Sequence, residues 1–158
     1  MKTFLATIIL CLAANISLAC SSDKVTLQWE GGAAEFTVDV VDTPASRAKG
    51  LMFVESMPRF NGMLFVYPEP QPQIAFWMRN TLISLDILFF DQAGILKTIQ
   101  ANAVPLDETS LPGGTDIQYV LEINGGLSER LRIPLGASLT SPFVSEELAK
   151  SPCPNTSQ

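Results

Sequence analysis

The chemistry open to this chain is limited first by a residue type that it lacks. None of its 158 residues is histidine. Ser-His-Asp and Cys-His nucleophilic systems are therefore excluded, and so are the usual histidine-based zinc or iron sites. The glycine-rich residues 112–115 lack the lysine and the spacing of a phosphate-binding loop. Carboxylate, arginine, amide and methionine chemistry remains, and we assign no catalytic residue, no metal and no cofactor.

Four polar side chains beside apolar positions form the candidate ligand-binding site, together with a neighbouring tryptophan. Asp86 interrupts a strongly apolar run, and Glu122 stands among valine, leucine and isoleucine. Arg47 and Asn80 flank apolar segments in the same way, and Trp77 precedes Asn80 by three positions. The pattern is typical of a polar site at one end of a β structure, able to hold a small polar ligand.

Two other interpretations of these residues stay open. In the structural one, Arg47 forms an ion pair with one of the acids and Asn80 caps a turn through its side chain. In the catalytic one, Asp86 and Glu122 hydrolyse a glycoside, which requires both carboxyls to face one cleft about 5–10 Å apart.

Three methionines near two aromatic residues suggest a further ligand set. Met52, Met63 and Met78 could supply soft thioether ligands for Cu(I), and Phe76 and Trp77 lie next to Met78 in the sequence. Methionine also fills gaps in a core and packs well against aromatic rings. Strand alternation places Phe76 and Met78 on one face and Trp77 on the other, which favours the packing interpretation.

The elements that must position these residues are mainly short strands. Thr43 as N-cap and Pro44 at the first helical position predict a helix over Pro44–Lys49, ended by Gly50, and a second short helix is expected over Leu127–Leu131. The result is a mostly β fold, a β-rich barrel or a two-sheet sandwich, with two short helices. Period-two alternation, apolar runs and turn residues between them predict strands at 25–29, 34–41, 62–67, 74–78, 83–90, 95–104, 118–123 and 138–143, with loops at 68–73 and 105–116.

The N-terminal residues are typical of a cleavable signal peptide. Lys2 precedes the uncharged apolar run 4–14, which is shorter than the roughly 20 residues that a membrane-spanning helix needs. Ser17 and Ala19 fit a cut after Ala19. We therefore expect a leader at 1–19, an N-terminal linker at 20–26, one β domain at 27–143 and a polar C-terminal tail at 144–158, in a protein that is exported to the periplasm or secreted.

Two cysteines remain after such a cut, Cys20 and Cys153. In an oxidising compartment they are expected to pair as a disulfide. The alternative is lipidation of Cys20, which would anchor the protein to the envelope, although Ser17 stands where a lipobox has a larger aliphatic residue. The two interpretations exclude each other because both use the same sulfur atom.

The charge of the chain restricts its partners. The formal net charge is −6, and the basic residues are dispersed without a basic stripe. This balance argues against binding to a phosphate backbone, so no nucleic acid is expected as a partner. No later apolar run is long enough for a transmembrane span.

Several sequence blocks make the chain resemble the DUF192 family, also called UPF0127. They are residues 47–52, 62–67, 76–91 with the core Phe-Trp-Met-Arg-Asn-Thr, and 120–126. The resemblance extends over residues 27–139, with one departure at Ser84, where the family usually has proline. It implies a compact β-rich domain with short helices, commonly exported in bacteria, and it implies no activity.

From these observations we expect an exported β domain that binds a small polar ligand or an envelope component. A carboxylate-based hydrolase using Asp86 and Glu122 is the enzymatic alternative. A structural or interaction module of the cell envelope, with an exposed apolar patch and no concave polar pocket, is the third.

Overall fold

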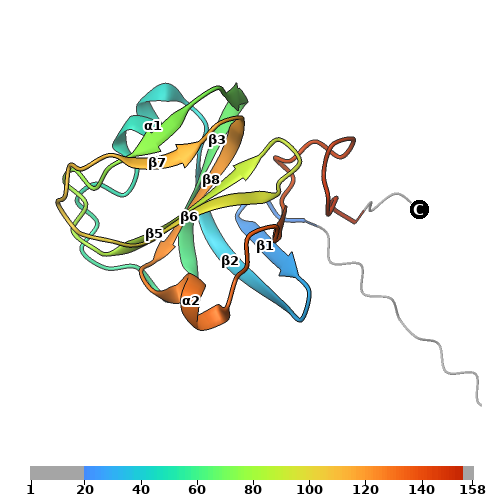
Figure 1. The fold of residues 1–158 in the computed structure, drawn as a ribbon, viewed down its shortest axis with the longest axis horizontal. Helices are drawn as coiled ribbons and strands as arrows, with labels where there is room; N and C mark the ends of the chain where they lie inside the picture. The colour runs from blue at the N-terminus through green and yellow to red at the C-terminus, as the bar shows by residue number, and fades with distance from the viewer. Residues whose placement is uncertain (1–19, 155–158) are drawn as a thin grey trace, which may run out of the picture.

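Strands dominate the fold, and the most apolar strands lie at its centre. The computed structural model describes residues 20–154, so the predicted leader lies outside the described residues. The predicted mostly β fold with two short helices is confirmed (Figure 1). The elements in chain order are β1 (Lys24–Trp29), β2 (Gly32–Val41), α1 (Pro44–Lys49), β3 (Asn61–Gln71), β4 (Ile74–Phe76), β5 (Leu85–Asp91), β6 (Leu96–Ala103), β7 (Leu111–Gly114), β8 (Ile117–Asn124), α2 (Leu127–Leu131) and β9 (Ser138–Thr140).

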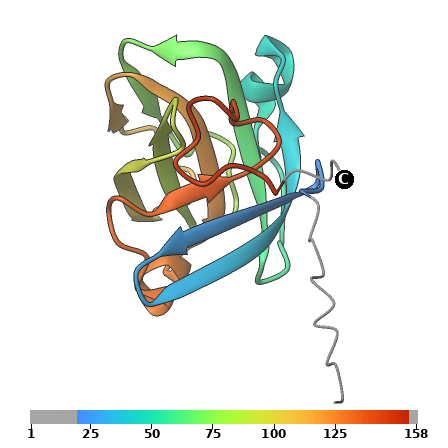
Figure 2. The same ribbon diagram turned by 90° about the vertical axis from the view of Figure 1, so that its right-hand side faces the viewer.

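Seven strands form one curled sheet in the order β6-β5-β8-β3-β2-β1-β9. An isolated antiparallel bridge between Ile95 and Ser138 joins the start of β6 to β9. The Leu139 N–H donates to the Gly94 carbonyl at 2.7 Å beside this bridge. The two edge strands therefore meet at one end, and the sheet is a half-barrel (Figure 2).

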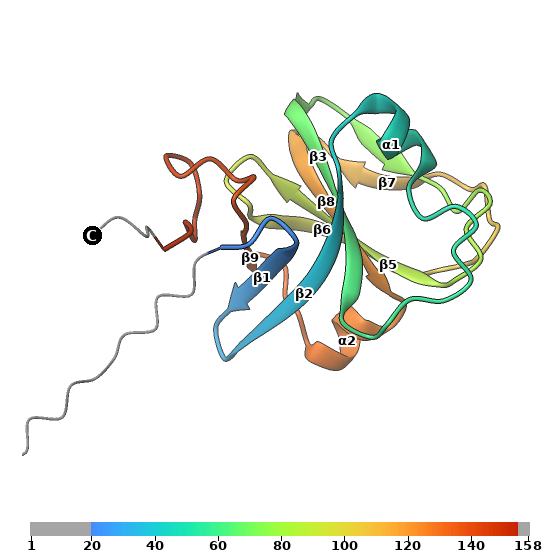
Figure 3. The ribbon, with the colours of Figure 1, turned by 180° about the vertical axis from the view of Figure 1, so that it is seen from behind.

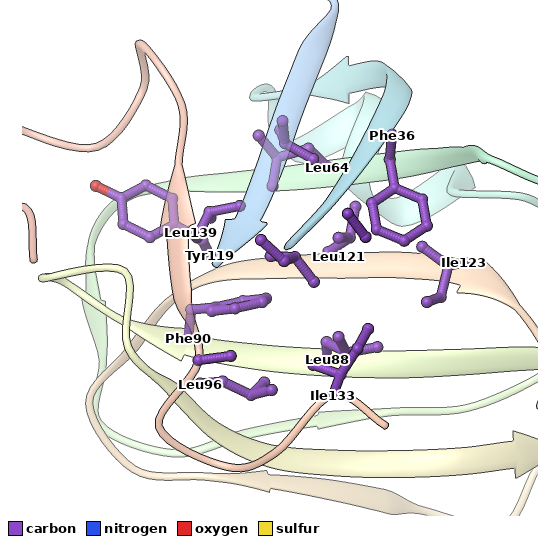
Figure 4. Packing of buried hydrophobic residues seen from close by; sticks show 14 of the residues in the cluster. Phe36, Leu64, Leu88, Phe90, Leu96, Tyr119, Leu121, Ile123, Ile133 and Leu139 are labelled. Atoms are coloured by element: carbon purple, nitrogen blue, oxygen red, sulfur yellow. The ribbon is translucent and has the colours of Figure 1, made fainter. Parts of the chain in front are cut away.

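The interior of the curl is filled by side chains from all seven strands. Figure 4 shows this cluster, in which Phe36, Leu88, Leu121 and Leu139 come from four different strands. A second apolar cluster lies on the opposite face of β3, β5 and β8, and includes Phe65, the side chains of Ile87 and Phe89, and Met78. Strands β5 and β8 are thus covered on both faces, which explains their nearly continuous apolar sequences.

The second cluster is covered in part by a small sheet that the sequence did not predict. Strand β7 pairs antiparallel with β4, although residues 105–116 were expected to form a loop. The proline-containing residues 68–71 were also expected to be irregular, and they extend β3 instead. Conversely, β4 ends at Phe76, so Trp77 and Met78 follow the strand.

The connection from β2 to β3 determines where the basic residues of α1 lie. These two strands are parallel, so the chain must cross over between them. The crossover contains α1, which begins with a capping box between Thr43 and Ser46 and has Pro44 in its first turn. Figure 3 shows α1 next to β3, at the end of the molecule where β7 also lies. Arg47 and Lys49 are thereby brought to the second face of the sheet, which is the face that carries the second apolar cluster.

The two ends of the described chain are joined covalently. A disulfide links Cys20 and Cys153, whose Cα atoms are 5.7 Å apart, as predicted. Strand β1 begins at Lys24, inside the segment expected as a linker. After β9 the chain folds back beside the sheet (Figure 2), where the Lys150 N–H donates to the Ala93 carbonyl. No helix in residues 20–154 is long and apolar enough to cross a membrane.

Candidate binding pocket

A pocket of about 230 Å³ opens between α1, β3 and β4 on the second face of the sheet. The helix and the residues that follow it form one side, and the aromatic residues of β3 and β4 form the other. Gly50 ends α1 at a φ of +48°, where a Cβ would lie 3.2 Å from the ring of Phe65. The lining residues are Arg47, Ala48, Lys49, Gly50, Leu51, Met52, Phe65, Tyr67, Ala75, Phe76, Trp77, Arg79, Thr81 and Glu122.

Glu122 supplies a buried carboxyl group to this pocket from the centre of the sheet. It lies on β8 opposite Met63 of β3 and Ile87 of β5, and only 4% of its surface is exposed. Its Oε2 has no hydrogen-bond partner among the described residues. Burial raises the pKa of this carboxyl to about 8, because the charged form loses its hydration. Glu122 is therefore mainly protonated at neutral pH and can donate a hydrogen bond.

Asp86, the second predicted acid, lies on the opposite face of the sheet. On the adjacent strands, Asp86 is opposite Ile123 whereas Ile87 is opposite Glu122. Side chains opposite each other share a face, and successive side chains alternate, so the two carboxyls point to different sides. The expectation that both face one cleft was wrong, and the paired-carboxylate hydrolase loses its geometric basis.

The carboxyl of Asp86 is fully used by the backbone. One oxygen accepts from the N–H groups of Asn102 and Gly126, and the other accepts from the N–H of Ser128, each at 2.8 Å. Two of these donors belong to the start of α2 and the third to β6. Asp86 is thus a structural acceptor that fixes the position of α2 on the sheet.

Arg47 lines the pocket without pairing to either acid. Its Nη1 donates to the carbonyl of Val66 at 2.9 Å and to the carbonyl of Asp42. Its guanidinium lies 4.6 Å from the centre of the Tyr67 ring. The expected structural ion pair with Asp86 or Glu122 was therefore wrong, because backbone carbonyls and an aromatic ring hold this side chain.

Asn80 and Trp77 have separate roles. Asn80 has a φ of +55° and accepts from the Phe53 N–H through its backbone carbonyl, while its Nδ2 lies 3.9 Å from the Met52 sulfur. It does not line the pocket, and its side chain makes no cap of the kind expected. Trp77 lines the pocket and is 46% exposed, with the guanidinium of Arg79 5.5 Å from its ring centre.

The methionines belong mainly to the core. Met63 and Met78 are buried in the second cluster, whereas Met52 is partly exposed at the pocket. Phe76 stacks edge-on against Phe65 and Phe89, with ring centres 5.0 and 5.5 Å apart. This arrangement agrees with the interpretation that the methionine and aromatic residues pack in the core.

Three titratable residues of the pocket were not predicted from the sequence: Lys49, Tyr67 and Arg79. Burial raises the pKa of Tyr67, Arg47 acts against that shift, and Glu122 adds to it. The ion pairs found in the described part of the chain join Lys24 to Glu35 and Lys97 to Asp91. The basic residues of the pocket take part in neither. The signal that could have identified Lys49 and Arg79 was their position in the same sequence blocks as Arg47 and Trp77.

Comparisons with known proteins place the chain in one family. The model of DUF192, described as an uncharacterized ACR family, matches residues 25–141, and the chain belongs to this family. The crystal structure of a protein of unknown function from Novosphingobium aromaticivorans is 43% identical, with a TM-score of 0.71 over 73% of this chain and 82% of that one.

A second crystal structure is also similar. It is a Sinorhizobium meliloti protein whose description suggests a transcription regulator, with 34% identity and a TM-score of 0.72. The similarity covers 77% of this chain and 95% of that one. No curated protein matches the chain significantly.

Proposed function

We propose that this DUF192 protein is a binding module that holds a small polar ligand in the pocket beside Glu122. One observation carries the proposal. A carboxyl that is 4% exposed has an oxygen without a hydrogen-bond partner in the described structure, and this group lines an open pocket. Buried polar atoms are nearly always paired, and an unpaired one lowers stability by about 1–3 kcal/mol. A ligand that pairs with Glu122 would remove that cost.

The shape of the pocket supports a ligand rather than a purely structural role for Glu122. The aromatic walls and few polar groups of the pocket are typical of small-molecule sites. The volume of about 230 Å³ suits a compact molecule. The proposal includes no reaction, since Asp86, the second acid that hydrolysis would require, faces the other side of the sheet.

Filling the pocket with a side chain tests this proposal. Ala75 is exposed on β4 and lines the pocket, so Ala75→Trp should occupy it. Ala101 is exposed on β6 outside the pocket, and Ala101→Trp is the matched control. A screen of amino acids, sugars and cell-wall fragments by NMR chemical shifts should give hits that Ala75→Trp loses and Ala101→Trp keeps. Hits that both variants retain would place binding elsewhere.

A second candidate function, docking on an envelope component, is favoured by exposed apolar side chains near the pocket. Phe53, Leu82, Val104 and Leu106 are each at least 43% exposed, and we call them the apolar rim. The Phe53 N–H donates to the Asn80 carbonyl and the Leu106 N–H to the Thr81 carbonyl, so these loops lie together. Exposed apolar patches often mark interaction surfaces.

Co-sedimentation with vesicles made of envelope lipids tests the apolar rim. The double variant Phe53→Ser/Leu106→Ser should release the protein from the vesicles if the rim binds them. Leu135→Ser is the matched control, because Leu135 is 63% exposed outside the rim. Equal sedimentation of both variants would argue against the rim as a docking surface.

Export to the periplasm or the medium is part of the proposal. The predicted leader and the Cys20–Cys153 disulfide support it, since disulfides persist mainly in oxidising compartments. Cell fractionation tests the location. Intact mass with and without reductant distinguishes the disulfide from a lipid on Cys20, because acylation would add mass and leave Cys153 free for alkylation.

A further inference from the structure

The charges around the pocket are unusual for this acidic chain. Arg47, Lys49 and Arg79 all line the pocket, although the formal net charge of the protein is −6. None of the three belongs to an ion pair found in residues 20–154. The one acidic residue of the lining is Glu122. The pocket thus gathers three basic side chains that form no ion pair with an acidic side chain of the described chain.

Two hydrogen-bond donors line the pocket beside these basic residues: the protonated Glu122 carboxyl and the Tyr67 phenol. The Arg47 guanidinium lies 4.6 Å from the centre of the Tyr67 ring, and Arg47, Tyr67 and Glu122 all line the same pocket. Burial raises the pKa of Tyr67 above its ordinary value of 10, so the phenol is protonated at neutral pH and remains a donor. A protonated carboxyl and a phenol are hydrogen-bond donors, and a carboxylate ligand offers two oxygens that accept from both.

We propose that the ligand of this pocket is a small monocarboxylate with a flat apolar body. Its carboxylate accepts from the Glu122 carboxyl and the Tyr67 hydroxyl near Arg47, and its body packs against Phe76 and Trp77. Lys49 and Arg79 attract it electrostatically. This inference rests on the proposed function, because it requires that the pocket binds a ligand at all.

A cationic or a neutral ligand fits the pocket less well than a carboxylate. An ammonium ligand would be repelled by three basic side chains and would require Glu122 to ionise in a buried position. A neutral sugar would leave the positive charge of the lining without a counter-charge. A carboxylate satisfies both the unpaired donor and the surrounding cations.

The inference makes binding depend on pH through Glu122. A carboxylate ligand binds the protonated form, and the pKa of this group is about 8. Raising the pH from 7 to 9 reduces the protonated fraction of Glu122 about tenfold, so the affinity should fall about tenfold.

Other charged or titratable groups lie on the same face as Glu122. They are Tyr67 on β3, Arg47 and Lys49 on α1, Arg79 after β4, and the exposed Asp39 on β2, which shares the face through Met63. Tyr67, whose pKa is raised above 10, stays protonated through pH 9.

Three probes of nearly equal shape test the charge preference: benzoate, benzylamine and benzyl alcohol. Isothermal titration of the mature protein at pH 7 should show benzoate binding most tightly. Lys49→Ala/Arg79→Ala should weaken benzoate about threefold to tenfold, whereas Lys97→Ala, an exposed lysine outside the pocket, is the control. Preference for benzylamine or benzyl alcohol would retain the binding pocket and overturn the carboxylate inference. Binding of none of the three at millimolar concentration would count against both proposals.

Glu122→Gln tests the role of the carboxyl itself. An amide N–H₂ donates at every pH, so the tenfold loss of benzoate affinity between pH 7 and pH 9 should disappear in this variant. Glu122→Leu removes the donor and should weaken benzoate at pH 7 about tenfold, with little dependence on pH. A benzoate affinity that still falls with pH in Glu122→Gln would overturn the assignment of the proton donor.

Discussion

Two buried acids on neighbouring strands have opposite surroundings. Asp86 on β5 accepts three backbone N–H bonds and is completely buried. Glu122 on β8 is almost as buried, yet its Oε2 has no partner in the described structure and borders a pocket. Both interrupt apolar runs in the same way. Burial alone therefore does not distinguish the two acids. The oxygen without a partner, next to a pocket, is what makes Glu122 rather than Asp86 the candidate for ligand binding.

The largest effect is expected at Asp86. Asp86→Asn should lower the free energy of unfolding by about 3–5 kcal/mol, because both oxygens accept N–H groups and the amide must face one donor with its own N–H₂. Asp91→Asn on the same strand is the matched control. Both hydrogen bonds to Asp91 reach a single oxygen, Oδ1, which asparagine keeps, and the ion pair of Oδ2 with Lys97 is partly exposed, so a loss below about 1 kcal/mol is expected. Urea denaturation measures both, and equal losses would remove the distinction.

The opposite sign is expected at Glu122. Its folded pKa of about 8 lies above the ordinary 4.5, so the native state binds more protons than the unfolded state between these values. The stability associated with this group is full below pH 4.5 and is lost as the pH rises toward 8. Glu122→Gln should therefore match the wild type near pH 4 and exceed it by on the order of 3–5 kcal/mol at pH 8.

Measurement of the free energy of unfolding against pH checks this second prediction. Glu30→Gln, at an exposed acid in the turn between β1 and β2, is the control and should follow the wild-type profile. A Glu122→Gln profile parallel to that of the wild type would mean that Glu122 ionises normally in the native state. The contrast with Asp86 would then be lost.

A smaller effect is expected at Arg47, which forms the pocket wall next to Glu122. Arg47→Lys should cost about 1–2 kcal/mol, since an ammonium group cannot replace the flat guanidinium, which stacks on Tyr67 while its Nη1 bonds the carbonyls of Asp42 and Val66. Arg79→Lys is the matched control, because Arg79 is exposed over Trp77, and a change below about 0.5 kcal/mol is expected. Thermal unfolding distinguishes the two. Equal effects would mean that Arg47 does not organise the wall.

The sequence allowed most of the fold to be predicted but little of the site geometry. Alternation and apolar runs located the principal strands, and the cap residues located α1. Strand β7 was missed because its Leu-Pro-Gly-Gly sequence is typical of a turn, and its pairing depends on tertiary contacts. Gly113 packs so closely on Phe89 that a Cβ would lie 2.2 Å from the ring. No local pattern contains that contact.

The candidate acids show the same limit more clearly. Alternation places Asp86 on the face of Leu88 and Phe90, and Glu122 on the face of Val120. It does not say how the faces of two strands correspond, because that depends on the register in which the strands pair. The sequence singled out both acids as candidate site residues, but the shared cleft that the hydrolase alternative required is not formed, because the register places them on opposite faces. Tyr67 was hidden at the end of an apolar strand, where nothing distinguishes it from core residues.

The smallest effect on stability is expected at Lys49 and Arg79, the exposed basic residues of the pocket. Measuring it distinguishes a role of these residues in ligand binding from a role in folding. Lys49→Ala and Arg79→Ala should each change the free energy of unfolding by less than about 0.5 kcal/mol, because both residues are exposed and belong to no ion pair found in the described chain. Lys24→Ala is the control for a surface lysine that does have a partner, Glu35, and an exposed ion pair of this kind contributes little to stability. Urea denaturation at pH 7 measures all three. Losses above 1 kcal/mol at Lys49 or Arg79 would show that the pocket cations are structural, like the donors around Asp86. Small losses would mean that any effect of these variants on a bound ligand comes from the ligand itself, because the fold of the pocket is unchanged.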